Sequence, residues 1–323
     1  MKAAVYYVTG PPSVLRYEEV PDPVCHPRGV VIKVQAVSIE GGDVLNRAGG
    51  AMTARPHIVG YQAAGVVREA GAEVTDRRVG QRVVGIAPNG SHAELFSLPA
   101  ASTWVVPDGM DIAVAACVPI AFGTADDCLF EFGRLKAGES VLIQAGAGGV
   151  GLAAIQLAKR AGATVFATAS SDEKLARLKE FGVDYGINYR ERDFVEEVKR
   201  LTSGRGVDLV VDSVGGAVLQ GSLRCLAYKG RAISVGSAGR DRQQPDLSLV
   251  AGRNCSYTSV SFGAERNADP ERVMPMVQKH LEDVNAGRLR VVIDREFPLA
   301  EAAAAHAYIE SRQAFGRVVL RVT

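Results

Sequence analysis

Residues 146–151 read Gly-Ala-Gly-Gly-Val-Gly, the pattern G-x-G-x-x-G, between an apolar run at 140–144 and a helical pattern at 149–161. In that setting the first glycine permits a tight turn, the second lets backbone approach a pyrophosphate, and the third lets helix and strand pack. The N-terminus of the helix offers unpaired N–H groups and a partial positive charge. The segment predicts a dinucleotide-binding turn; the alternative is a glycine-rich turn that binds nothing. The residues expected to contact the ligand are Gly146, Gly148, Gly149, Val150 and Gly151.

From about residue 139 the sequence alternates between strand and helix patterns. Such alternation predicts right-handed βαβ units and a parallel sheet covered on both faces, that is, a doubly wound α/β domain. The predicted strands are 140–144, 164–168, 208–211 and 232–235, and the predicted helices are 149–161, 172–181, 193–201 and 217–226.

The N-terminal part has a different rhythm, with β-branched runs at 30–34, 65–69 and 82–86 separated by Gly, Pro and Asp clusters. Short strands between such turns favour an all-β, barrel-like domain. The pattern returns near the C-terminus, where 289–293 and 317–322 read as strands around an Ala-rich helix at 299–311, and we expect the last strand to rejoin the barrel. The predicted domains, packed closely around a cleft, are a β-barrel domain of 1–118 with 290–323 and an α/β domain of 119–289.

Composition excludes several classes of partner and site. The chain has 323 residues, with 37 Lys+Arg against 36 Asp+Glu, so it lacks the single-sign field that holds nucleic acid or an anionic membrane. Its five cysteines are scattered without a C-x-x-C pair, which argues against a disulfide framework or a four-thiolate zinc site. We therefore expect a cytoplasmic protein with no nucleic-acid and no membrane partner.

The end of the second predicted strand of the α/β domain selects the cofactor. A site for NAD normally has Asp or Glu there, about 20 residues after the glycines, to bind the adenosine ribose. This sequence has residues 168–171, Thr-Ala-Ser-Ser, followed by Lys174 and Arg177. Hydroxyls and an ammonium group favour a 2′-phosphate, so NADPH is the better match. Alternatively, Ser170 caps the helix in a box with Glu173 and Lys174 is a solvated charge.

These motifs resemble the zinc-independent quinone oxidoreductase branch of the medium-chain dehydrogenase/reductase superfamily, essentially end to end. The resemblance implies a GroES-like β-barrel domain and a Rossmann domain, usually in a homodimer. It also implies reduction of quinones or α,β-unsaturated carbonyl compounds with NADPH in the cleft between the domains. The stretches that carry the resemblance are 1–5, 57–65, 145–151, 187–190 and 212–216.

The resemblance further implies cofactor contacts outside the glycine turn. The matching residues are Ser170, Lys174 and Tyr189 at the 2′-phosphate end, and Thr124, Gly236 and Phe262 at the nicotinamide half. Two of them have plain alternatives, because Tyr189 would equally pack on a loop and Phe262 would equally belong to the core.

Zinc members of the superfamily carry three features: a Cys, a Gly-His-Glu motif and a lobe with four cysteines. Here the first position matches Glu40, the second reads Gly-Tyr-Gln at 60–62, and the lobe is absent between Gly85 and Leu98. Because the thiolate and imidazole ligands that hold Zn²⁺ are missing, we expect no catalytic metal.

Two residues are candidates for catalysis. Tyr61 matches the position of a zinc-ligating His, so it is expected to face the nicotinamide and donate a proton or hydrogen bond; the alternative is an aromatic wall of the pocket. Glu40 stands where the quinone oxidoreductases usually have Asn, and its carboxylate would repel an anionic enolate unless it is protonated or paired with Arg47. Asp43 fits a helix cap as well as a pocket residue.

The sequence thus predicts an NADPH-dependent, zinc-independent reductase of a small quinone or enone. Two alternatives stay open: a 2-enoyl thioester reductase, and a non-catalytic NADPH-binding protein with a structural or regulatory role.

Overall fold

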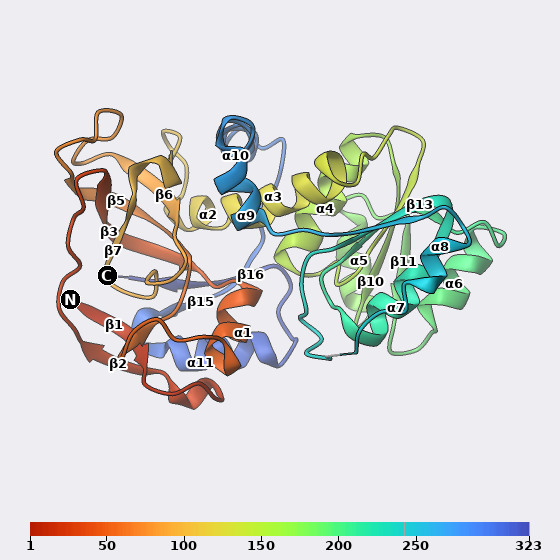
Figure 1. Cartoon of the computed structure of the whole chain (residues 1–323), viewed down its shortest axis with the longest axis horizontal. Coiled ribbons are helices and arrows are strands. Elements are labelled where there is room, and N and C mark those ends of the chain that lie inside the picture. The colour runs from red at the N-terminus through yellow and green to blue at the C-terminus, as the bar shows by residue number, and fades with distance from the viewer. Residues whose placement is uncertain (242, 323) are drawn as a thin grey trace. The chain divides into compact units, whose positions relative to one another are not determined.

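The computed structural model describes residues 1–241 and 243–322, which form two compact units. The first, here called the barrel unit, contains residues 1–120 and the residues from Glu271 on; the second, the Rossmann unit, contains Ala121–Pro270. Figure 1 shows the strands of both units. Each unit is described by itself below.

The Rossmann unit is built on a six-stranded sheet in which every pair of neighbours is parallel. The order β11-β10-β9-β12-β13-β14 is the 3-2-1-4-5-6 order of dinucleotide-binding folds. The predicted doubly wound domain is confirmed. The strands are β9 (Ser140–Ile143), β10 (Thr164–Ala169), β11 (Tyr185–Asn188), β12 (Val207–Asp212), β13 (Leu226–Ser234) and β14 (Ser256–Ser259).

Helices connect these strands, and α5, α6 and α9 start at polar side-chain caps. The Asp193 carboxylate accepts from two backbone N–H groups at the start of α6, and the Ser171 hydroxyl accepts from one at the start of α5. The helices are α3 (Val118–Asp126), α4 (Gly149–Arg160), α5 (Asp172–Lys179), α6 (Phe194–Leu201), α7 (Gly216–Arg224), α8 (Ser248–Ala251) and α9 (Phe262–Ala268). Apolar side chains of the sheet and of α6 and α7 form a core on one face.

The barrel unit holds a seven-stranded sheet and a smaller sheet of three strands, β2-β1-β4. In the large sheet the order is β15-β16-β3-β5-β6-β8, and β7 pairs with β3. The last strand lies antiparallel to β3, so its predicted return to the barrel is confirmed. The strands are β1 (Lys2–Tyr6), β2 (Arg16–Glu19), β3 (Gly29–Ser38), β4 (His57–Ile58), β5 (Gln62–Ala70), β6 (Arg82–Ile86), β7 (Leu95–Pro99), β8 (Thr103–Val105), β15 (Ile293–Pro298) and β16 (Arg317–Arg321).

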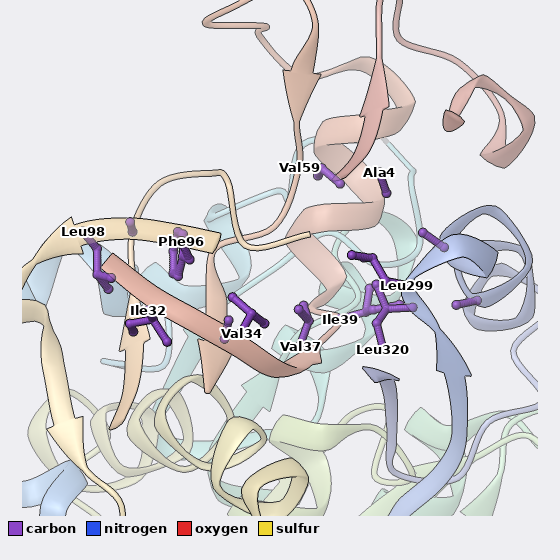
Figure 2. Close-up of a cluster of buried hydrophobic side chains, with 14 of the residues drawn as sticks. Ala4, Ile32, Val34, Val37, Ile39, Val59, Phe96, Leu98, Leu299 and Leu320 are labelled. Carbon is purple, nitrogen blue, oxygen red and sulfur yellow. The ribbon is translucent and has the colours of Figure 1, made fainter. Parts of the chain in front are cut away.

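Apolar side chains from facing elements fill the core of the barrel unit. Figure 2 shows Ile32, Val34 and Val37 of β3 beside Phe96 of β7 and Leu320 of β16. Helices α1 (Gly41–Gly49), α2 (Ile112–Ala116) and α11 (Ala302–Glu310) belong to the same unit. The five side chains named above are all buried, so the hydrophobic effect holds strands β3, β7 and β16 together.

The predicted strand at 289–293 is wrong, because β15 begins at Ile293. The N–H groups of Arg288 and Leu289 bond instead to the Asp283 carbonyl, at 2.8 and 3.2 Å, and so close the end of the preceding helix. These donors are satisfied by a helix end rather than by a strand partner.

The preceding helix, α10 (Pro270–Asn285), belongs to the barrel unit. The domain boundary predicted from the sequence, at 289, would have placed it in the α/β domain. Two side-chain hydrogen bonds explain the difference. The Trp104 indole donates to the Met274 carbonyl at 3.0 Å, and the Gln278 amide donates to the Val105 carbonyl at 3.2 Å. The first boundary lies at 120, close to the expected 118. Thr323, the last residue of the expected barrel domain, lies outside the described residues.

Within residues 1–241 and 243–322, no helix combines the length and the apolar character needed to cross a membrane.

Candidate active site

The glycine turn joins β9 to α4 at the carboxyl edge of the parallel sheet. Ala145 opens it with φ of 53°, and the Gly148 N–H donates to the Ala145 carbonyl at 3.0 Å. A Cβ on Gly151 would lie 2.5 Å from that carbonyl oxygen, so only glycine lets the helix approach so closely. Gly148, Gly149 and Val150 are half-exposed at the helix N-terminus, where backbone N–H groups are available to an anion.

Ser170 and Tyr189 directly follow two neighbouring strands. Ala169 and Asn188, the last residues of β10 and β11, are paired in the sheet, and the Tyr189 N–H donates to the Ala169 carbonyl at 3.2 Å. The predicted 2′-phosphate residues Ser170 and Tyr189 therefore come together at one edge, with Lys174 in the first turn of the following helix.

The helix cap beside this edge differs from the alternative given by the sequence. Ser171, not Ser170, caps α5, and its hydroxyl accepts from the Lys174 N–H at 3.3 Å. The nearest acid, Asp172, accepts from the Asn188 amide at 3.2 Å. The Asp172 carboxylate thus already has a hydrogen-bond partner, Asn188, in the same unit.

Tyr189 is 41% exposed and lines a cavity of about 440 Å³ in the Rossmann unit. The wall carries two cations, Arg192 and Arg224, and the aromatic ring of Phe194. Both the contact with cofactor and the alternative, packing of Tyr189 on a loop, stay predictions.

The three residues expected near the nicotinamide occupy different environments. Phe262 is buried, and its ring lies 2.4 Å from the position that a Cβ on Gly123 would take, so it packs on α3 as a core residue does. Thr124, the next residue of α3, is also buried. Gly236 is exposed just after β13, at the same carboxyl edge as the glycine turn.

In the barrel unit, Glu40 begins α1 in a capping box, and its backbone N–H donates to the Asp43 carboxylate at 2.9 Å. The Glu40 carboxylate accepts from the guanidinium of Arg317 and from the Ser38 hydroxyl. Arg317 also donates to Ser38 Oγ, at 2.6 and 3.0 Å, and to the Ile39 carbonyl at 3.0 Å. The side chains of Ser38, Glu40, Asp43 and Arg317 are all buried.

Gln62 extends this cluster toward the end of α2. Its amide nitrogen donates to Glu40 Oε1 at 3.0 Å and to the Ala116 carbonyl at 2.5 Å, and its oxygen accepts from the Ile120 N–H at 2.8 Å. Gln62 therefore ties the carboxylate to the end of α2 and the start of α3. We call Ser38, Glu40, Gln62 and Arg317 the Glu40 cluster.

Burial and charge shift the ionisation of the acids here. Burial raises the pKa of Glu40, and the Arg317 guanidinium opposes that shift. Burial raises the pKa of Asp43 further above its usual range. Of the two conditions open from the sequence, a protonated Glu40 or a pair with Arg47, the second does not occur: the buried Arg47 guanidinium contacts the Glu310 carboxylate and the Gly10 carbonyl, and Glu40 pairs with Arg317.

Tyr61 lies beside the same acids. A Cβ on Gly42 would be 2.6 Å from the Tyr61 hydroxyl, so that hydroxyl rests against the first turn of α1. Burial and the nearby Asp43 and Glu40 carboxyls raise the pKa of Tyr61 well above its usual value. The hydroxyl is thus a weaker acid than a free tyrosine, and it is better suited to donate a hydrogen bond than a proton.

Comparisons with known proteins agree with this architecture. Residues 26–108 match the family "Alcohol dehydrogenase GroES-like domain", and residues 149–279 match the family "Zinc-binding dehydrogenase". The chain is 34% identical to a 2-haloacrylate reductase of Burkholderia, over 98% of both chains. It is 32% identical to a quinone oxidoreductase of Pseudomonas aeruginosa, over 96% of both. The chain belongs to the zinc-independent quinone oxidoreductase branch of the medium-chain dehydrogenase/reductase superfamily.

Solved structures of this branch have the same fold. The Escherichia coli quinone oxidoreductase complexed with NADPH superposes with a TM-score of 0.95 and 27% identity, over 99% of this chain and 100% of that one. Other relatives are far longer: the chain spans 14% of the length of the phthioceranic/hydroxyphthioceranic acid synthase of Mycobacterium tuberculosis, which is 35% identical over 92% of this chain.

By the resemblance given above, Glu40 and Tyr61 match two positions where zinc members of the superfamily carry ligands, and Gln62 follows the second. The Glu40 and Gln62 side chains are the ones that pair here. In this quinone oxidoreductase-like chain they bond to each other and to Arg317. In the part of the chain that the structure describes, no three His, Cys, Asp or Glu side chains are grouped so that they could hold a metal ion.

Arg317 and Ser38 were not predicted as members of this site. Arg317 stands 277 residues from Glu40 in the sequence, so no spacing links the two. The one available signal was the predicted return of the last strand to the barrel, which places Val319 of β16 opposite Ser38 of β3.

Proposed function

We propose that this chain is an NADPH-dependent oxidoreductase that reduces quinones or small α,β-unsaturated carbonyl compounds without a metal. The observation that carries the proposal is the glycine turn at the carboxyl edge of a 3-2-1-4-5-6 sheet, where a Cβ at position 151 would fill the space between helix and strand. The NADPH complex of the related Escherichia coli enzyme supports the same cofactor for this chain.

The preference for NADPH over NADH rests on the end of β10. No acid follows this strand directly, and Asp172, the nearest one, already accepts a hydrogen bond from Asn188. The hydroxyl of Ser170, the ammonium of Lys174 and the phenol of Tyr189 offer donors to a 2′-phosphate.

When bound, the nicotinamide supplies a hydride from its C4 atom. The remaining tasks belong to residues of this chain. The N-terminus of α4 would hold the pyrophosphate. In the barrel unit, the Tyr61 hydroxyl would donate a hydrogen bond to a substrate oxygen on which negative charge develops. The Glu40 carboxylate would not repel that charge, because Arg317 neutralises the carboxylate; Glu40 instead positions Gln62, which bonds to the end of α2 and the start of α3.

A turnover assay tests this proposal. Purified protein is mixed with NADPH, and the near-ultraviolet absorbance of the cofactor is followed while a naphthoquinone, an enone and an enoyl thioester are offered in turn. We expect oxidation with the quinone or the enone. Oxidation with the thioester alone would favour the thioester reductase alternative, and tight binding without oxidation by any acceptor would contradict the enzyme proposal. The homodimer and the cytoplasmic location expected from the sequence stay predictions.

A further inference from the structure

A continuous chain of hydrogen bonds crosses the carboxyl ends of β10, β9 and β12 in the Rossmann unit. The Thr168 hydroxyl donates to Gln144 Oε1 at 2.7 Å, the Gln144 amide donates to Ser222 Oγ at 3.0 Å, and the Ser222 hydroxyl donates to Asp212 Oδ2 at 2.8 Å. We call Thr168, Gln144, Ser222 and Asp212 the relay.

Each end of the relay holds a turn. At one end the Ala145 N–H, which opens the glycine turn, donates to Thr168 Oγ1 at 3.2 Å. At the other end Asp212 Oδ1 accepts from the N–H groups of Val214 and Gly215, both at 2.8 Å. The relay thus connects the glycine turn of residues 145–151 with the turn of residues 213–216 that follows β12.

All the donors in the relay point the same way, and the series ends on a carboxylate. Hydrogen bonds arranged head to tail polarise one another, and those that end on an ionised group are the stronger ones. The four side chains are at most 3% exposed, so water cannot replace a lost partner. Burial raises the pKa of Asp212, while its bonds to the Ser222 hydroxyl and to the two backbone N–H groups oppose that shift.

The turns that the relay holds have backbone conformations that need support. Ala145 has φ of 53°, in the left-handed region that a residue with a Cβ rarely adopts, and its N–H is held by Thr168. Gly215 has φ of 77°. A turn of this kind keeps its shape only where its surroundings determine it.

We propose that Gln144 and Ser222 are positioning residues, which set the spacing of the two turns at the dinucleotide site through a hydrogen-bond relay that touches no ligand. This proposal rests on the proposed function, since the two turns matter because a dinucleotide binds at that edge. The Ser222 hydroxyl bonds to Gln144 and to Asp212, so its effect on the glycine turn passes through Gln144, which precedes Ala145 and also accepts from Thr168.

The test compares Ser222→Ala with Ser140→Ala. Ser140 also donates its hydroxyl to a carboxylate, that of the half-buried Asp208 at 2.9 Å, but it does so at the opposite, amino end of the same sheet. Hydrogen–deuterium exchange of the free protein is measured for peptides covering 144–151 and 212–217, and the Kd for NADPH is measured by the fluorescence of the bound cofactor. Thermal unfolding reports the stability of each variant.

We expect Ser222→Ala to speed exchange in both turns and to raise the Kd about tenfold, the effect of one lost buried hydrogen bond. Ser222→Thr keeps the hydroxyl and should restore both values. Ser140→Ala should lower the melting temperature while both turns and the Kd stay as in the wild type. If Ser222→Ala does not fold, Thr168→Val, which removes one hydroxyl at nearly constant volume, should give the same two changes.

The proposal is overturned if both turns and the Kd are unchanged in a folded Ser222→Ala or Thr168→Val protein, or if Ser140→Ala changes them equally. A wild-type protein that does not bind NADPH would instead contradict the proposed function, and exchange in the free protein would still decide whether the relay couples the two turns.

Discussion

Among single residues, Glu40 and Arg317 form a buried ion pair that stabilises the barrel unit. Both side chains are buried, and the guanidinium also holds Ser38 and the Ile39 carbonyl. Replacing Glu40 with Gln leaves a buried guanidinium without its carboxylate. We expect Glu40→Gln to lower the free energy of unfolding in urea by about 3–5 kcal/mol.

The control for that prediction lies on the same last strand. Arg321 makes two hydrogen bonds to Glu296, at 2.8 and 2.9 Å, but both side chains are more than one-third exposed. Because water solvates these charges, Glu296→Gln should cost at most about 1 kcal/mol. Equal losses for the two variants would show that the burial of the Glu40 pair has no energetic consequence.

Lys174 is the residue expected to distinguish the two nicotinamide cofactors. Removing its ammonium should weaken binding of the doubly charged 2′-phosphate, so Lys174→Ala is expected to raise the Kd for NADPH roughly tenfold and leave that for NADH unchanged. Titration of each cofactor by fluorescence gives both values. Lys179→Ala, at the exposed end of the same helix, serves as the control. An unchanged ratio of the two Kd values in Lys174→Ala would exclude a phosphate contact.

At the scale of elements, a buried histidine pair joins α11 to the loop before β7. His92 Nε2 and His306 Nε2 lie 3.1 Å apart, so one ring donates a hydrogen bond to the other, and the ring that accepts is neutral. Burial lowers the pKa of His92 well below its usual value, and burial with the nearby Arg47 lowers the pKa of His306 to about 3. The unfolded chain, with ordinary values near 6.5, therefore binds more protons than the folded one in acid.

The contribution of this pair to the free energy of unfolding should be fully present above the unfolded pKa of about 6.5. It should fall as the pH falls toward 3. Between about pH 7.5 and about pH 5, His306 should lose about 2 kcal/mol of its contribution to the free energy of unfolding in urea, and His92 should add to that loss because its pKa is lowered too. His26→Gln, at an exposed position, should keep the same pH dependence as the wild type. A double variant, His92→Gln with His306→Gln, should have a flatter profile; an unchanged slope would contradict the assignment.

The start of α4 allows a second test at this scale. A Cβ at position 151 would meet the Ala145 carbonyl oxygen at 2.5 Å, so Gly151→Ala should lower the free energy of unfolding by about 1–3 kcal/mol and weaken NADPH binding. Gly263 in α9 has nothing within 4 Å of the corresponding position. Gly263→Ala should therefore stabilise the protein by up to about 1 kcal/mol. Unfolding curves in urea compare the two, and a stabilising Gly151→Ala would contradict the close approach.

At the scale of the whole molecule, the sequence predicted what depends on local patterns. The glycine turn and the alternation of strands and helices predicted the parallel sheet and its ligand edge, because each βαβ unit carries its own signal. What depends on distant pairing was missed. The Glu40–Arg317 pair and the place of α10 depend on contacts across 277 and 170 residues, which no local pattern contains. Ser171 rather than Ser170 caps α5; a sequence pattern does not place the end of a helix to within one residue.

Hydride transfer from NADPH to an electron-poor carbon is tested by NADPH deuterated at C4, in each of its two configurations, with an enone as acceptor and NMR of the product. We expect deuterium at the β-carbon of the product from one of the two cofactors only, since a protein site presents one face of the nicotinamide. Product without deuterium from either cofactor, or no product at all with a panel of quinones and enones, would contradict it.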